Sequence, residues 1–337
     1  MQDGAAQMSD YSPPYTITGR MLELVSAISE KIGKISSLRE LEYKPHLRRN
    51  NQIRSIHASL KIEANSLSLD EVRDVINGHP VMGDRKEIQE VKNAYEAYSL
   101  IDGIDPASID DLKRMHGIMT SRTLEESGAF RKGNEGVFSN GKCIFVCPPP
   151  GMVNGLMSAL LSWVKKSEGI VHPLIMAAIF HYEFVFIHPF ADGNGRMARL
   201  WHTALLYRWR KIFKYIPLES QIEKYQEAYY DAIAKCHACG NSNIFIEFML
   251  EMTDKVVDDA IKQAEKEDAE TSEYVKRLLA IMEYDVPYTA KAIMERLGLK
   301  SKDTLRKNYL NPAIELGLIR MTLPQKPSSK NQRYVKL

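Results

Sequence analysis

The spacing of apolar positions in this 337-residue chain changes at one point in a way that predicts two helices joined by a tight loop. Leu174–Ile187 is apolar on nearly every side, which predicts a helix buried in a core. Pro189 disfavours helical geometry at the residue before it, so this helix is expected to end at His188. From Gly195 onward apolar residues recur at helical spacing, which predicts a second helix. Ala191–Asn194 then forms the loop between the two helices.

A different pattern lies upstream, where residues with strand propensity flank a turn dipeptide. From Val137 to Pro150 the sequence reads V-F-S-N-G-K-C-I-F-V-C-P-P-P. Asn140-Gly141 is a strong hairpin turn, and the proline run closes the second strand. This segment is therefore predicted to be a β-hairpin.

The pattern changes again towards the end of the chain. Asp254–Ser272 is charged and helical, which predicts the end of a core helix running into a linker. Three helical patterns and then two strands follow: Val275–Met282, Ala290–Leu297, Ser301–Leu316, Ile319–Leu323 and Gln332–Leu337. Such a series is typical of a winged helix, a fold used for DNA binding and equally for protein contacts.

Basic side chains gather where the third helix of this module begins, at Lys300, Lys302, Arg306 and Lys307. A recognition helix would carry phosphate or base contacts there. Asp303 lies among them, however, and basic residues at helix ends are also ordinary solvated charge. DNA binding and protein contact both stay open for this module.

Composition restricts the class of protein without deciding its function. The 45 basic and 43 acidic residues give a net charge of +2, which by itself implies no strong attraction to nucleic acid or membranes. The sequence contains no apolar window of membrane-spanning length and no secretion signal at its start, so we expect a soluble cytoplasmic protein. Four cysteines form two close pairs, which invites a zinc interpretation, although reduced thiols are the default in the cytosol. These are Cys143, Cys147, Cys236 and Cys239.

The loop between the two central helices carries the chemistry. His188–Arg199 reads H-P-F-A-D-G-N-G-R-M-A-R. The imidazole can take a proton from a hydroxyl near neutral pH, and Asp192 offers a hard oxygen ligand for Mg²⁺. The glycines and the start of the second helix suit an anion. Arg196 and Arg199 lie on one helix face just beyond, where guanidinium groups suit phosphate oxygens. The set predicts nucleotide phosphates held for attack.

This string resembles the signature of the Fic family, H-x-F-x-(D/E)-G-N-G-R-x-x-R, at every defined position. The resemblance implies transfer of AMP from ATP to a Ser, Thr or Tyr hydroxyl of a protein, with release of pyrophosphate. It makes His188 the general base and Asp192 the Mg²⁺ ligand. Family members that transfer the γ-phosphate have lysine at the second glycine of the G-N-G, so Gly195 favours nucleotide transfer. The resemblance further implies that Arg196 binds the β-phosphate and Arg199 the γ-phosphate. It places an anion hole for the α-phosphate at Gly193, Asn194 and Gly195.

A second segment similar to a Fic motif lies far upstream. Ser59 and Glu63 are four residues apart, hence on one helix face, and the stretch S-L-K-I-E-A-N is similar to the inhibitory motif (S/T)-x-x-x-E-(G/N). The resemblance implies that Glu63 pairs with Arg199 and blocks the γ-phosphate position. The match is partial because Ala64 stands where the family has Gly or Asn. A glutamate on a solvated helix face is the alternative.

Two further sites follow from the family resemblance. The hairpin resembles the Fic flap, which docks a target peptide as an added strand, with Ile144 and Phe145 in its second strand. The helical stretch Tyr225–Ile233 resembles the nucleobase side of the family's site, with Tyr229 or Tyr230 beside the adenine. Aromatic residues at helical spacing are also typical of a core.

The expected fold is mainly α, a Fic-type helical bundle with a small hairpin flap and a C-terminal winged helix; the resemblance covers about residues 16–256 and, more loosely, the last sixty. The expected parts are 1–105 (N-terminal helical region, inhibitory helix around 55–65), 106–256 (Fic catalytic core, flap 136–148), 257–272 (helical linker) and 273–337 (winged helix).

The expected function is a self-inhibited protein adenylyltransferase that uses ATP and Mg²⁺. Its partner is a protein with an exposed hydroxyl, and self-modification and a homodimer are compatible with the sequence. Removal of AMP by the same site and a DNA-binding regulator are the alternatives.

Overall fold

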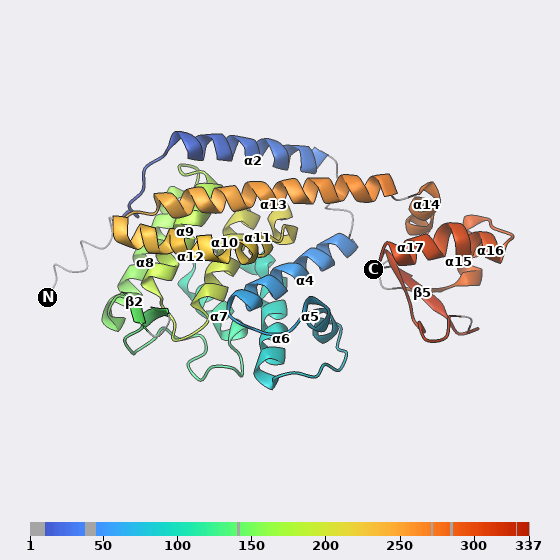
Figure 1. Ribbon diagram of the computed structural model, residues 1–337, viewed down its shortest axis with the longest axis horizontal. Helices are drawn as coiled ribbons and strands as arrows, with labels where there is room; N and C mark the ends of the chain where they lie inside the picture. The colour runs from blue at the N-terminus through green and yellow to red at the C-terminus, as the bar shows by residue number, and fades with distance from the viewer. Residues whose placement is uncertain are drawn as a thin grey trace. The chain divides into compact units, whose positions relative to one another are not determined.

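The computed structural model describes residues 11–37, 45–139, 142–270, 272–283, 286–327 and 329–336. The chain is mainly helical, as the sequence predicts, and it forms two compact units (Figure 1). The first unit holds residues 11–37 and 50–258, and the second holds residues 45–49 and 259–336. No helix in these described ranges is long and apolar enough to cross a membrane.

The first unit is a helical bundle with one hairpin at its surface. Its α-helices are α2 (Gly19–Ser37), α4 (Pro45–Ile62), α5 (Leu69–Ile76), α6 (Arg85–Ser99), α7 (Ile109–Met119), α8 (Pro150–Ser167), α9 (Pro173–Ile187), α10 (Asn194–Trp209), α11 (Leu218–Lys224), α12 (Gln226–Cys239) and α13 (Asn243–Glu270). Residues 45–49 of α4 and 259–270 of α13 belong to the second unit. Two short 3₁₀ helices, η2 (Ile101–Gly103) and η3 (Lys211–Tyr215), connect some of them.

Helices α9 and α10 form the centre of this unit. Almost every residue of α9 is buried, because its side chains are apolar on nearly every face, apart from His181 and Glu183. The helix ends where Pro189 predicts, and His188 takes a left-handed φ of 51°. Gly193 precedes α10 with a φ of 78°, a conformation that would cost another residue about 1–2 kcal/mol. The predicted helix–loop–helix is confirmed.

The hairpin consists of β1 (Gly136–Ser139) and β2 (Lys142–Val146), paired antiparallel. Its register shifts between Val137 and Phe138, so that Phe138 faces Cys143 across the pair. The predicted Asn140-Gly141 turn lies outside the described residues. Phe145 in β2 stacks on the ring of His237 in α12, with 4.0 Å between ring centroids. The hairpin is thereby attached to the bundle through an aromatic contact.

Helix α2 lies alongside α13 (Figure 1), and polar contacts join residues 18–31 to residues 247–258. Near the start of α2, the hydroxyl of Thr18 donates to Glu247 at 2.7 Å. Further along, Lys31 pairs with Asp254 at 2.7 Å and with Asp258 at 2.9 Å. The N-terminal segment therefore forms part of the first unit.

The second unit has the helices and sheet of a winged helix. Its elements are α14 (Glu273–Ile281), β3 (Pro287–Thr289), α15 (Ala290–Leu297), α16 (Lys302–Thr304), the π-helical turn η4 (Leu305–Leu310), α17 (Asn311–Glu315), β4 (Ile319–Met321) and β5 (Arg333–Lys336). The strands form an antiparallel sheet in the order β3-β5-β4. The sequence predicted only the last two strands. Strand β3 was missed because it has three residues and a single buried side chain, Tyr288, which is too short for an alternating pattern.

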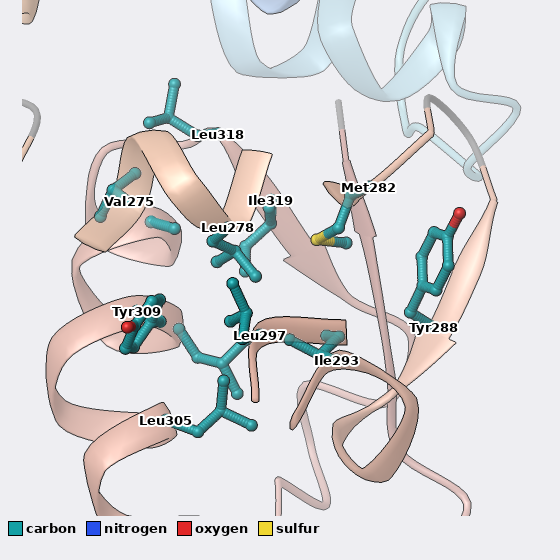
Figure 2. Close-up of a cluster of buried hydrophobic side chains, with 12 residues drawn as sticks. Val275, Leu278, Met282, Tyr288, Ile293, Leu297, Leu305, Tyr309, Leu318 and Ile319 are labelled. Atoms are coloured by element: carbon teal, nitrogen blue, oxygen red, sulfur yellow. The ribbon is translucent and has the colours of Figure 1, made fainter. Parts of the chain in front are cut away.

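The core of the second unit is apolar. Val275 and Leu278 of α14 pack with Ile293, Leu305 and Tyr309 from the following helical segments (Figure 2). The basic residues at the start of the third helical segment are exposed, namely Lys300, Lys302, Arg306 and Lys307. Burial of the apolar faces gives this unit a core of its own.

Candidate active site

His188 is placed by the end of α9, and one of its ring nitrogens is bonded by no described residue, so it can act as a base. Its Nδ1 lies 3.3 Å from the carbonyl oxygen of Val185. Because a carbonyl can only accept, Nδ1 carries the proton and Nε2 is the basic nitrogen. Burial lowers the pKa of the imidazole below its usual value, and the charge of Arg131 acts in the same direction. The ring is therefore neutral at pH 7.

The loop after His188 is shaped by the side chain of Asn194. Its amide oxygen accepts the N–H of Phe190 at 2.9 Å, and its amide nitrogen donates to the Phe190 carbonyl at 2.7 Å. The N–H of Gly193 donates to Oδ1 of Asp192 at 2.6 Å. Both polar atoms of the Asn194 side chain are thus engaged within the loop. The part of the predicted anion hole that can meet a ligand is the backbone at the start of α10.

His116 on α7 fixes the same loop, although the sequence pattern did not single it out. Its Nδ1 accepts the N–H of Gly128 at 2.9 Å, so Nε2 carries the proton and donates to the carbonyl of Asp192 at 3.0 Å. The ring also stacks on Phe190 with 3.6 Å between centroids and 2° between planes. Burial lowers the pKa of His116 to about 4, which keeps the ring neutral for this role.

Arg196 is buried and bound by two carboxylates. Its Nη1 lies 3.2 Å from Glu90 on α6, and its Nη2 lies 3.2 Å from Asp192. Glu90 also accepts a hydrogen bond from Asn65 at 3.0 Å. Sequence reasoning missed Glu90, because nothing near it in the sequence connects α6 to α10. The predicted phosphate ligand Arg196 is thus tied to the turn that follows α4.

Arg199 is enclosed by Ser59 on α4 and by Glu63 in the turn that directly follows α4. Nε donates to the Ser59 hydroxyl at 3.0 Å, and Nη2 donates to the Ser59 carbonyl at 2.9 Å and to Glu63 Oε1 at 2.8 Å. The Arg199 side chain is 1 % exposed, whereas that of Glu63 is 33 % exposed. The predicted contact between Glu63 and Arg199 is present.

The Glu63 carboxylate also rests on the first turn of α10. A Cβ added to Gly195 would lie 2.2 Å from Glu63 Oε1, far inside van der Waals contact. Only glycine leaves room for the carboxylate at this position. Glu63 therefore occupies the space where an anion would approach the helix start.

The end of α4 explains the partial match at Ala64. The N–H of Ala64 donates to Lys61 and that of Asn65 to Leu60, which is a Schellman motif with Ala64 in its left-handed position. Ala64 has a φ of 65°. Glycine and asparagine adopt this conformation more readily than alanine does. Alanine at this position therefore raises the conformational free energy of the turn but leaves the geometry of the turn intact.

The two tyrosines predicted beside the adenine differ in their surroundings. Tyr229 on α12 is 2 % exposed, and its hydroxyl lies 2.9 Å from Nε2 of His181. Tyr230 is 48 % exposed. Tyr229 is thus a core residue behind Arg199, as its helical spacing also allowed. Contact of either ring with a nucleobase stays a prediction.

The Asp192 carboxylate fits the predicted magnesium role as a single ligand. Its side chain is 44 % exposed, and among the described residues its oxygens accept from Gly193 and Arg196. In the described part of the chain no three His, Cys, Asp or Glu side chains gather as a metal site. Mg²⁺ commonly takes one or two carboxylates and completes its shell with phosphate oxygens and water. The donor set therefore fits a metal that arrives with a nucleotide.

The chain matches two family descriptions. Residues 106–206 match the Fic/DOC family, and residues 273–336 match the Fic-like C-terminal domain of filamentation induced by cAMP proteins. A crystal structure of a Fic family protein from Desulfovibrio desulfuricans G20 is 40% identical, with a TM-score of 0.74. That likeness covers 97% of this chain and 98% of the other.

Curated relatives are more distant. A protein adenylyltransferase Fic from Aedes aegypti is 30% identical over 216 residues, which cover 61% of this chain and 41% of the relative. The Drosophila melanogaster protein of the same name is 29% identical over 245 residues, which cover 70% of this chain and 46% of the relative. The chain thus spans less than half the length of these relatives.

Proposed function

Because this chain belongs to the Fic/DOC family, we propose that it is a protein adenylyltransferase. The observation that carries the proposal is His188, a partly buried neutral imidazole whose basic nitrogen is bonded by no described residue, beside the loop that leads to Arg196 and Arg199. Its substrates are ATP and a protein with an exposed Ser, Thr or Tyr hydroxyl. The hairpin β1-β2 is proposed to hold the target as an added strand.

In the proposed reaction the hydroxyl oxygen attacks the α-phosphorus of ATP. A bond forms between that oxygen and the phosphorus, and the bond to the bridging oxygen of the β-phosphate breaks, so that pyrophosphate leaves. The hydroxyl proton passes to Nε2 of His188. Arg196 and Arg199 hold the leaving phosphates. Mg²⁺, held by Asp192, would supply further neutralisation of phosphate charge.

We propose in addition that Glu63 inhibits the enzyme. Its carboxylate is bonded to Arg199 at 2.8 Å and lies against Gly195, so that it takes both the guanidinium and the space that phosphates need. ATP could then bind only with its phosphates misaligned. Transfer in the parent protein is expected to be slow.

The test is AMP incorporation from labelled ATP and Mg²⁺, followed by mass analysis of the protein itself. We compare the parent with Glu63→Gly, Glu63→Gln and the double variant Glu63→Gly with Arg199→Ala. Glu63→Gly should raise self-modification strongly, and Glu63→Gln, which keeps the bulk but not the charge, should raise it less. The double variant should lose most of the gain. No transfer by any variant would refute the enzyme assignment, and equal rates for parent and Glu63→Gly would refute the inhibition alone.

Removal of AMP from a modified protein is a second candidate for the same site. Glu63 keeps a third of its side chain exposed beside the phosphate-binding residues, where a carboxylate could orient a water molecule. In that direction the parent protein, with Glu63 present, should release AMP from a modified acceptor and Glu63→Gly should not. Incubation of purified AMP-protein with each form distinguishes the two directions.

A further inference from the structure

Arg131 lies between the end of α9 and the foot of the hairpin, and its guanidinium is bonded to main-chain oxygens of both. On the helix side, Nε donates to the His188 carbonyl at 2.6 Å and Nη2 donates to the Ile187 carbonyl at 3.3 Å. On the hairpin side, Nη1 donates to Gly133 at 2.8 Å and Nη2 to Pro148 at 2.6 Å. One side chain therefore joins the residue that carries the base to the two ends of the hairpin.

The surroundings of this cation are unusual. Arg131 is 3 % exposed, yet in the described ranges it forms no ion pair with a carboxylate. A buried charge without such a partner is costly unless other groups compensate it. Here the carbonyls at the end of α9 do so, because they carry the negative end of the helix dipole. The backbone N–H of Arg131 adds a bond to the Pro189 carbonyl at 2.9 Å.

The contacts on the hairpin side lie at both of its feet. Gly133 precedes β1 and Pro148 follows β2, so Arg131 fixes each strand where it leaves the bundle. The N–H of Cys147 donates to Glu135 at 3.1 Å and closes the hairpin between these two points. Any movement of the hairpin relative to His188 must therefore break bonds to the same guanidinium.

We propose that Arg131 is a positioning residue that holds the hairpin at a fixed place relative to His188, so that a hydroxyl on an added strand meets Nε2. The inference rests on the proposed function, and Arg131 acts through the backbone without touching substrate. A misplacement of about 1 Å between reacting groups can cost about 10²-fold in rate. Loss of this side chain should therefore reduce transfer to a protein acceptor much more than it reduces ATP binding.

The experiment uses the full chain in the Glu63→Gly background, which frees the phosphate site. Arg131→Gln removes the charge. Arg131→Lys keeps the charge but loses the planar guanidinium that donates several hydrogen bonds at once. Arg114→Gln is the matched control, because Arg114 is an exposed arginine that pairs with Asp111 on its own helix. For each form we measure ATP affinity, kcat and KM for a protein acceptor, and hydrogen exchange resolved by segment.

Both Arg131 variants should bind ATP within about twofold of the background while kcat falls about 10²-fold and the KM for the acceptor rises. Exchange should increase in the hairpin amides and stay unchanged in α10 and α13. Transfer at the rate of the Glu63→Gly background by a folded Arg131→Gln would overturn the proposal. Hydrogen exchange that rises evenly through the first unit in Arg131→Lys would also overturn it. That result would show that Arg131 stabilises the whole unit and does not specifically hold the hairpin. The exchange measurement needs no activity, so it stands even where the proposed transfer fails.

Discussion

The two units of this protein differ in the polarity of the side chains that they bury. Around α9 and α10 the first unit buries ionisable and polar groups, namely His181, Glu183, Asn194, Arg196, Arg199 and His202. The described interior of the second unit is apolar, and Gln332 is the buried polar side chain recorded there. Burying charge is costly, so a fold that does so needs partners for each group. The contrast indicates that the first unit carries the chemistry while the second is an ordinary hydrophobic module.

Acid provides the strongest test of this contrast. Burial lowers the pKa of His116 and of His202 to about 4, below the value near 6.5 expected in the unfolded chain. Between these values the unfolded chain binds more protons, so the free energy of unfolding of the first unit should fall as the pH falls from about 6.5 to about 4. Each imidazole contributes on the order of 3 kcal/mol. Glu183 opposes this trend, because burial raises its pKa.

The measurement can separate the two units without cutting the chain. All three tryptophans, Trp163, Trp201 and Trp209, lie in the first unit, and residues 259–337 contain no histidine. Tryptophan fluorescence should therefore show an unfolding midpoint in urea that decreases with acid. Hydrogen exchange in α14 and α15 should change little over the same range. Equal acid sensitivity of both units would show that the contrast has no energetic consequence.

The next prediction concerns the rate of transfer and not the stability of the fold. In the Glu63→Gly background, His188→Ala removes the base and none of the predicted phosphate ligands. Transfer should fall by about 10²- to 10⁴-fold with ATP affinity nearly unchanged. Single-turnover rates and nucleotide binding measure the two quantities separately. Transfer at the background rate would show that another group accepts the proton.

Cavity formation tests the second unit. Leu278 in α14 is fully buried, so Leu278→Ala should destabilise this unit by about 3 kcal/mol. Tryptophan-monitored unfolding and ATP binding should remain unchanged, because both report the first unit. Leu323→Ala is the control, since Leu323 is 39% exposed and its truncation should cost less than about 0.5 kcal/mol. A loss of ATP binding in Leu278→Ala would show that the two units are energetically coupled.

The smallest expected change in stability concerns the residue that ends a helix in each of the two units. Helix α15 ends with Gly298 at a φ of 69°, whereas Ala64 takes the same left-handed place after α4. Ala64→Gly should therefore stabilise the first unit by less than about 1 kcal/mol, because relief of strain exceeds the added chain entropy. Ala58→Gly, within the same helix, should destabilise it by about 1 kcal/mol. Urea unfolding of both variants checks the signs, and a loss of stability in Ala64→Gly would contradict the interpretation of this turn.

The local features were readable from the sequence because they depend on neighbouring residues. The proline after His188 ends α9, and Gly193 permits the turn into α10. The hairpin strands and the helices of the second unit likewise follow from short patterns. The Fic signature joined these elements to a chemical role. Strand β3 was missed because three residues with one buried side chain show no period.

The contacts between distant segments were decided by tertiary packing. Glu63 and Arg199 are separated by 136 positions, and the resemblance, rather than any pattern of residues, predicted their pairing. Glu90 on Arg196, His116 under the loop and Arg131 at the hairpin were not predicted at all. A sequence records the backbone preference of each segment, whereas these bonds depend on where packed helices bring their side chains. The sequence by itself determined the elements and the reactive loop, and only the folded bundle determined which buried groups hold that loop in place.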